Sequence, residues 1–231
     1  MAVTRPGTPS VATRSATGTD ASVTHTVPAG TTLLVMTTMF EAGESVSGTP
    51  RWDASGGANL TLVDATFPSG SNNDMALETW AIVNPIAGSS QITVAHSSND
   101  NMITTAVNYA GTVTSSVAAA IQFLEEDVNN AATNTTVFAS AGTAGNCLYA
   151  TGSFKGGDGN GITVPTDFFE IHDVTSGGSA NADISGYVCD ELDGAPSACT
   201  WTWAATDENA GHYLEIIAAG PADVLMAQVM M

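Results

Sequence analysis

The stretch TTLLVMTTMF, Thr31–Phe40, decides the fold of this protein. Its apolar residues form a nearly continuous run, and it is rich in residues that favour strands over helices. The turn Pro28-Ala29-Gly30 precedes it. A short apolar run bounded by turn residues is typical of a strand that is buried on both faces. The stretch therefore predicts a central strand of a β-sheet.

Further strand signals surround this run at short intervals. Residues of alternating polarity precede it, and further strand-like segments rich in β-formers follow it, with Gly-, Pro- and Asn-rich turns between them: Val23–Val27, Leu60–Phe67, Met75–Val83, Gln91–Ala95 and Met102–Tyr109. Evenly spaced short strands with turn residues between them predict an all-β protein, an antiparallel β-sandwich of the jelly-roll-like kind.

The second half of the chain repeats this order. Leu34, Thr37 and Phe40 recur as Leu148, Thr151 and Phe154, and Met75–Val83 recurs as Ile184–Leu192. The last strand of each half ends in small residues, at 107–111 and at 216–220. An internal repeat with loop insertions has this pattern, which predicts two similar halves of about seven strands each.

The pattern divides the chain into five segments. An extended N-terminal arm, rich in Thr, Ser, Ala, Gly and Pro, spans 1–21, and the first β half spans 22–114. In the acidic linker at 115–134, the stretch Ser116–Asn129 predicts a strand leading into the linker, with a short helix as the second interpretation, and the second β half follows at 135–220. An apolar C-terminal tail spans 221–231.

The charge is strongly one-sided. The formal net charge is -19, and only four residues are Lys or Arg. A surface this negative repels nucleic acid and anionic lipid, so neither is an expected partner. The sequence also contains no run of 18 apolar residues, which predicts that no segment spans a membrane. Two of the cations, Arg5 and Arg14, lie in the arm.

The residues that carry chemistry form no recognisable catalytic motif, so we do not predict an enzyme. A pair of carboxylates acting on a polysaccharide stays open as a third hypothesis. No cofactor is expected, although Asp100, Asp158 and Asp207 lie in loops that are rich in oxygen ligands and could bind calcium.

Three other residues are candidates for specific roles. If 184–192 and 198–204 form a hairpin centred on Gly194, then Cys189 and Cys199 lie opposite each other and could form a disulfide. Trp52 follows Arg51 near a turn, and is the tryptophan that we expect to be exposed and able to contact a glycan.

Two motifs carry a resemblance to known proteins. The segment WAIVNPIAG, Trp80–Gly88, places an Asn-Pro turn after a strand, and AGPA, Ala219–Ala222, ends the last strand. Over roughly 22–222 the chain resembles a loosely defined group of β-sandwich virion and surface proteins of tailed phages and bacteria. The resemblance implies the fold and a structural role, with no catalytic residue to carry over.

These observations favour a virion structural protein, a decoration or cement protein on the capsid exterior that is made in the host cytoplasm. Its expected partners are the major capsid protein, other virion subunits and its own copies, for example in a trimer. The termini would make the contact, through Arg5, Arg14, Val224, Leu225, Met226, Val229, Met230 and Met231. The alternative is a carbohydrate-binding or adhesive module of a tail fibre or bacterial surface, and the third hypothesis is the acidic-site hydrolase.

Overall fold

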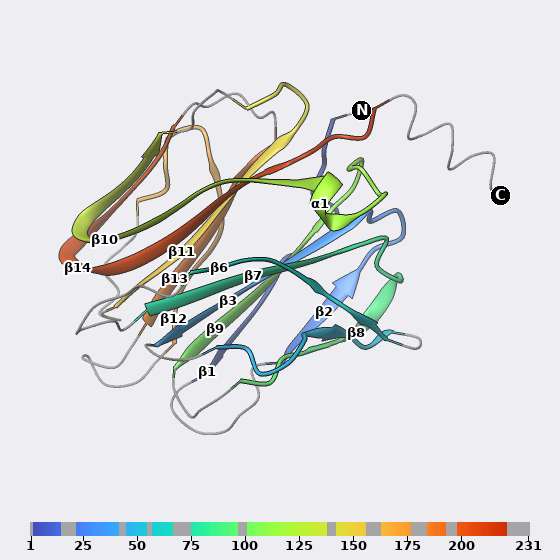
Figure 1. The fold of residues 1–231 in the computed structure, drawn as a ribbon, viewed down its shortest axis with the longest axis horizontal. Coiled ribbons are helices and arrows are strands. Elements are labelled where there is room, and N and C mark those ends of the chain that lie inside the picture. The colour runs from blue at the N-terminus through green and yellow to red at the C-terminus, as the bar shows by residue number, and fades with distance from the viewer. Residues whose placement is uncertain are drawn as a thin grey trace.

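The computed structural model describes residues 2–14, 22–41, 45–54, 57–66, 75–96, 101–137, 142–155, 163–176, 184–192 and 198–220. In this part of the chain the only helix is α1 (Val117–Ala120), and all other regular elements are strands. The expected all-β, antiparallel sandwich is therefore confirmed (Figure 1). No helix in the described ranges is long and apolar enough to cross a membrane.

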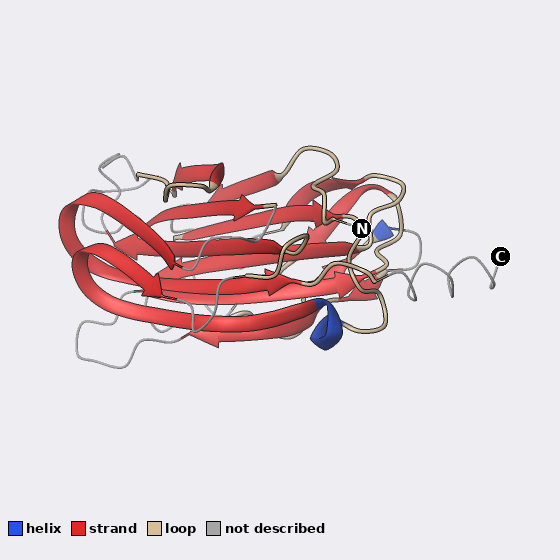
Figure 2. Cartoon of the chain, turned by 90° about the horizontal axis from the view of Figure 1, so that it is seen from above, coloured by secondary structure: helices blue, strands red, loops and turns tan. Residues whose placement is uncertain are grey.

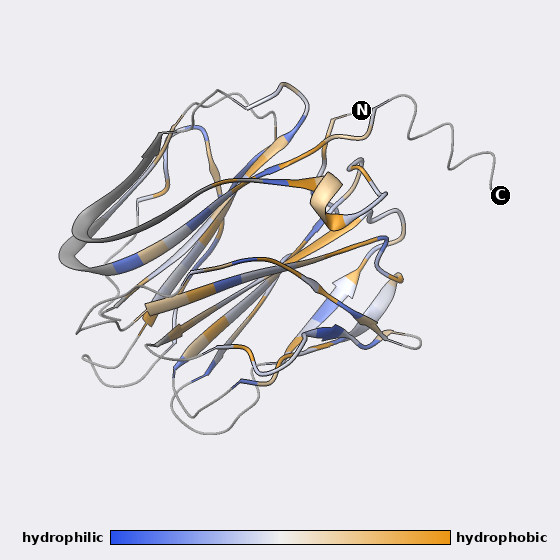
Figure 3. Ribbon diagram, in the orientation of Figure 1, coloured by the Kyte–Doolittle hydropathy of each residue, from blue (hydrophilic) through white to orange (hydrophobic). Residues whose placement is uncertain are grey.

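The first half is built on a five-stranded antiparallel sheet with β3 at its centre. Its strands, in spatial order, are β1 (Ser10–Arg14), β9 (Met102–Tyr109), β3 (Leu33–Glu41), β7 (Met75–Val83) and β6 (Thr61–Thr66). Leu34 and Phe40 of β3 enter one core, whereas Leu33 and Val35 enter another on the opposite face. The run that predicted a central strand is thus buried on both sides, and Figure 3 shows hydrophobic residues recurring along the neighbouring strands.

The second half has a five-stranded sheet with the same strand order. Its strands are β10 (Ile121–Val137), β14 (Ala198–Ile216), β11 (Cys147–Lys155), β13 (Ile184–Glu191) and β12 (Phe169–Thr175). A bulge recurs at the same place: between Leu62 and Asp64 in β6, and between Glu170 and His172 in β12. The two halves are therefore alike in topology as well as in sequence.

A third sheet covers the outer face of the first half. It consists of β2 (Val23–Val27), β8 (Gly88–Thr93), β4 (Arg51–Trp52) and β5 (Ala58–Asn59). In the second half the same role falls to the curled ends of β10 and β14, where 133–137 pair with 198–202 (Figure 2). In the second half the single long strand β10 thus takes the places that β1 and β2 occupy separately in the first half.

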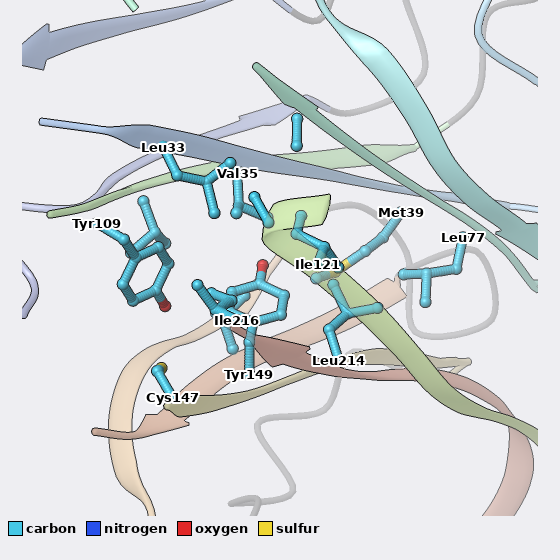
Figure 4. Packing of buried hydrophobic residues seen from close by; sticks show 14 of the residues in the cluster. Leu33, Val35, Met39, Leu77, Tyr109, Ile121, Cys147, Tyr149, Leu214 and Ile216 are labelled. Atoms are coloured by element: carbon cyan, nitrogen blue, oxygen red, sulfur yellow. The ribbon is translucent and has the colours of Figure 1, made fainter. Parts of the chain in front are cut away.

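Three hydrophobic cores result from this arrangement. The central core lies between the two five-stranded sheets, and Figure 4 shows Leu33 and Tyr109 of the first half facing Tyr149 and Ile216 of the second. A first-half core lies under the four-stranded sheet, and a second-half core lies under the curled strand ends. The halves therefore share one core, and each has another of its own.

The two halves pack with approximate two-fold symmetry. Strand β1 lies near β12 while β10 lies near β6, and β9 faces β13 while β14 faces β7. Because β1 corresponds to β10 and β12 to β6, each contact occurs twice with the partners exchanged. This is the pattern of a symmetric dimer interface, here formed within one chain.

Two predicted boundaries are wrong. The segment 1–21 is not a free arm, because Ser10–Arg14 forms β1 and Val3, only 2% exposed, lies in the central core. The segment 115–134 contains both the short helix of the second interpretation, α1, and the predicted strand, but this strand is β10 of the second half and not the start of a linker. In both cases an adjacent strand, β9 or β14, offers free backbone hydrogen-bonding groups that the segment satisfies.

Gly152 in the middle of β11 is a test of how tightly the second-half core is packed. A Cβ at this position would lie 2.7 Å from the carbonyl oxygen of Ala210 and would also meet the Tyr187 hydroxyl. We expect Gly152→Ala to lower the free energy of unfolding by about 2 kcal/mol, measured by urea denaturation. Gly186→Ala is the control, because its new methyl group meets the flexible thioether of Met39 and should cost clearly less. Equal costs would contradict this account.

Candidate functional site

Buried polar side chains link the two halves, and His212 of β14 lies at their centre. Thr79 Oγ1 is 2.9 Å from its Nδ1, and Thr66 Oγ1 is 2.7 Å from its Nε2. The Thr37 hydroxyl lies 3.3 Å from that of Thr79 and 2.9 Å from the Tyr149 hydroxyl. These contacts connect three strands of the first half with two of the second.

The environment of His212 determines its charge. Burial lowers the pKa of His212 to about 3. The Asp64 carboxylate lies 3.7 Å from Nε2, but that side chain is 32% exposed and solvated, so it offsets little of the cost of a buried charge. The imidazole is therefore neutral near pH 7. It can donate to one threonine hydroxyl and accept from the other, which suits a structural link rather than proton transfer to a substrate.

Arg5 forms a second link between the halves. Its Nη1 lies 2.6 Å from Oδ1 of the fully buried Asp190, and the Tyr109 hydroxyl donates to Oδ2 at 3.1 Å. Burial raises the pKa of Asp190, and the Arg5 guanidinium and Tyr109 oppose this rise. Arg5 is therefore already paired with a buried carboxylate of the same chain, so its charge is not needed for docking onto a partner.

Arg14 is also part of the folded body. It ends β1, where its guanidinium hydrogen-bonds Nε2 of the buried His96. In the same first half, the buried Glu78 accepts hydrogen bonds from the backbone N–H of Val46 at 2.8 Å and from Nε1 of Trp80 at 2.9 Å. Burial raises the pKa of Glu78. Arg14, at the end of β1 and bonded to His96, is therefore part of the folded body and not of a free arm.

Trp52 is not the exposed tryptophan that we expected. Its side chain is fully buried, and its Nε1 donates to the backbone oxygen of Ile86 at 2.9 Å. Side chains alternate along a strand, so in β4 the exposed Arg51 leaves Trp52 pointing into the first-half core. The predicted glycan contact at Trp52 is therefore wrong.

Cys189 and Cys199 are free thiols, and the hairpin from which we derived their pairing does not exist. In the sheet, β11 lies between β13 and β14 and takes the hydrogen bonds that the hairpin would have made. Both thiols are nevertheless completely buried in the second-half core.

The other predicted site residues lie outside the described side chains. Asp100 and Asp158 are not in the described ranges, and neither is the predicted docking tail with Val224, Leu225, Met226, Val229, Met230 and Met231. Asp207 pairs through its backbone with Ala131 in the β10–β14 ladder. Among the residues that are described, no group of three or more His, Cys, Asp or Glu side chains could hold a metal ion.

The exposed surface carries the features that are open to a partner. Phe169 is 64% exposed and Leu62 is 44% exposed, on β12 and β6. Each of these strands is at the edge of its sheet. Sequence reasoning missed Phe169, although Phe168-Phe169 contained the signal. Phe168, just before β12, enters the second-half core, and neighbours in an extended chain face opposite ways.

The sequence has 23 Asp and Glu residues against four Lys and Arg. Arg5 and Arg14 are engaged in the folded body. The exposed Arg51 lies 3.3 Å from Asp53 at the surface of the four-stranded sheet. Against a formal net charge of -19, little positive charge remains for the exterior. The candidate functional site is therefore an acidic outer surface with apolar side chains on two edge strands.

Comparison with known proteins gives no family for this chain, since no family model, no curated protein and no solved structure matches it.

Proposed function

We propose that the protein is a structural component of a virion, a decoration protein that binds the outside of a tailed-phage capsid. The distribution of charge carries this proposal. The formal net charge is -19, and the two arginines of the N-terminal segment are used inside the fold. A body with such a surface repels DNA, and electrostatics therefore favour the exterior of a DNA-filled shell over its interior.

The internal construction suits a structural role. Two alike halves share a continuous core, and the links through His212 and through Arg5–Asp190 join them. Most of the buried polar atoms in these two links have partners within the chain, which favours a single rigid arrangement. The resemblance to virion and surface β-sandwich proteins points the same way.

The contact with the shell is proposed to involve the edge strands. Phe169 presents a largely exposed aromatic ring on β12, and Leu62 presents an exposed aliphatic side chain on β6. Aromatic residues are frequent anchors of protein interfaces. A matching surface on the major capsid protein would be apolar where it receives these side chains and basic around them.

A single substitution tests this contact. Phe169→Ser should weaken binding to capsids assembled from the shell protein of the same genome by about tenfold, the equivalent of about 1.4 kcal/mol. Co-sedimentation with increasing protein concentration measures the affinity. Ile86→Ser is the matched control, because Ile86 is 43% exposed but lies in the turn after β7. Neither substitution should change the thermal unfolding temperature appreciably.

The outcomes separate the hypotheses. If the unaltered protein does not co-sediment with the shells at low or at moderate salt, the decoration role is wrong. If Phe169→Ser and Ile86→Ser bind as tightly as the unaltered protein, the role stands but the contact lies elsewhere. Binding that weakens as salt increases would show that the acidic surface meets a basic one.

An adhesive role is the second candidate, and the exposure of Phe169 is the observation that favours it. An aromatic ring on an exposed strand can stack on the apolar face of a sugar. A glycan array would then detect binding that Phe169→Ala abolishes and Ile86→Ala leaves intact.

A further inference from the structure

Cys189 and Cys199 come together although their strands are not neighbours in the sheet. Cys189 lies on β13, and Cys199 lies at the start of β14, where the strand curls over the face of its own sheet. Both side chains are 0% exposed and belong to the second-half core. The curled strand end therefore packs face to face on β13, across that core.

The neighbouring aromatic pair gives the alignment of the two segments. The rings of Tyr187 and Trp201 stack with centroids 3.7 Å apart. Cys189 is two residues after Tyr187, and Cys199 is two residues before Trp201. Alternate residues of a strand point to the same face, so an antiparallel crossing that stacks Trp201 on Tyr187 also brings Cys199 over Cys189.

The state of the thiols is consistent with this alignment. Burial raises the pKa of the Cys189 thiol well above its usual value, and a hydrogen bond with the Cys199 thiol raises it further. The Cys189 thiol is therefore protonated in the folded protein. The attacking species in disulfide exchange is the thiolate, so reaction requires the curled strand end to open.

Cys147 provides an internal comparison. It lies on β11, next to β13, but faces the central core on the opposite side of the sheet. The Tyr109 side chain of the central core lies beside it. The sheet itself therefore separates Cys147 from the other two thiols.

We propose that Cys189 and Cys199 form a disulfide that fastens the curled ends of β10 and β14 to the face of the second-half sheet when the protein meets a disulfide oxidant. With oxidised glutathione, one cysteine thiolate attacks the glutathione disulfide and forms a mixed disulfide, releasing one glutathione thiol. The second cysteine then displaces the other glutathione. Two protein thiols are oxidised, and one glutathione disulfide is reduced to two thiols.

The bond would act as a redox-dependent covalent cross-link. In a reducing cytoplasm the thiols persist, and after release into an oxidising medium the bond forms. It would close a short loop between two segments that pack on each other in the second-half core. The oxidised protein should then unfold more slowly than the reduced protein, because the curled end can no longer separate from β13. This inference is independent of the proposed capsid role.

The experiment uses the full chain, refolded from urea in a glutathione buffer with excess oxidised form. Of the three cysteines, one should then react with a thiol reagent under denaturing conditions. The mass should fall by about 2 Da, the two hydrogen atoms lost on disulfide formation. Peptide mapping should join the peptides that contain Cys189 and Cys199.

Two variants control the result. Cys147→Ala should still form the bond and leave no reactive thiol, whereas Cys189→Ala should not form it. Three reactive thiols after refolding, stable glutathione adducts at Cys189 or Cys199, or a bond that includes Cys147 would each overturn the proposal. So would an oxidised protein whose unfolding rate in urea is no lower than that of the reduced protein.

Discussion

Acidification from pH 7 to pH 4 should lower the free energy of unfolding by about 3 kcal/mol through His212 alone. The pKa of His212 is about 3 in the folded protein because the ring is buried, while an unfolded histidine has a pKa near 6.5. Below pH 6.5 His212 therefore binds a proton in the unfolded chain but not in the folded chain. The stability that the neutral ring contributes is complete above pH 6.5 and is lost as the pH falls towards 3.

His212→Gln isolates this effect. Glutamine has a donor and an acceptor for Thr66 and Thr79 but does not titrate, so the variant should lack the histidine part of the acid slope. Urea denaturation of both proteins at pH 7, 5.5 and 4 gives the two slopes. Any stability cost of the substitution at pH 7 should shrink as the pH falls. A difference that is constant with pH would show that His212 is accessible to protons in the folded state.

Replacing Arg5 with methionine should lower the free energy of unfolding at pH 7 by about 3 kcal/mol, because it leaves a buried carboxylate without its cation. Asp190 is completely buried, and Arg5 is the cation that pairs with it. The loss should depend on pH. Burial already raises the pKa of Asp190, and without Arg5 it should rise further. The stability difference between the variant and the unaltered protein should therefore be smallest below about pH 4, where Asp190 is protonated in both the folded and the unfolded state. It should grow as the pH rises through the raised pKa of Asp190.

Two further variants show whether the loss comes from the unpaired charge. Adding Asp190→Asn to Arg5→Met should recover part of the stability, because the double variant has no buried charge. Arg51→Met removes a cation from an ion pair that is 52% and 36% exposed, so it should cost less than about 1 kcal/mol. If Arg5→Met is as mild as Arg51→Met, the N-terminal segment does not hold the halves together in the way that we describe.

The all-β class and the likeness of the halves were predictable from local pattern. Thr31–Phe40 is apolar on both faces, which only a strand between two cores tolerates, and its counterpart in the second half is β11. The repeated bulges of β6 and β12 agree with the repeat that Met75–Val83 and Ile184–Leu192 had indicated. These features depend on neighbours along the chain, and for that reason the sequence contains them.

The candidate site residues were less predictable, because burial and pairing involve residues far apart in the sequence. In the sequence Arg5 looks like an arginine on a free arm. Its partner Asp190 is 185 residues away, and only the fold places the two side by side. In the sequence Trp52 looks like an exposed tryptophan, but in the fold its indole N–H donates to the backbone oxygen of Ile86. Cys189 and Cys199 do approach each other, but across a core rather than along a hairpin, because β11 is inserted between their strands.

The sequence by itself determined that this protein is an acidic, duplicated β-structure, since strand period, turn residues and charge are properties of short segments. Only the tertiary structure decided that the N-terminal segment belongs to the body, that the halves share one core, and that Phe169 rather than Trp52 faces outward. The reason is physical. The alternation along a strand shows which residues share a face, but which face is buried depends on the sheet that packs against it.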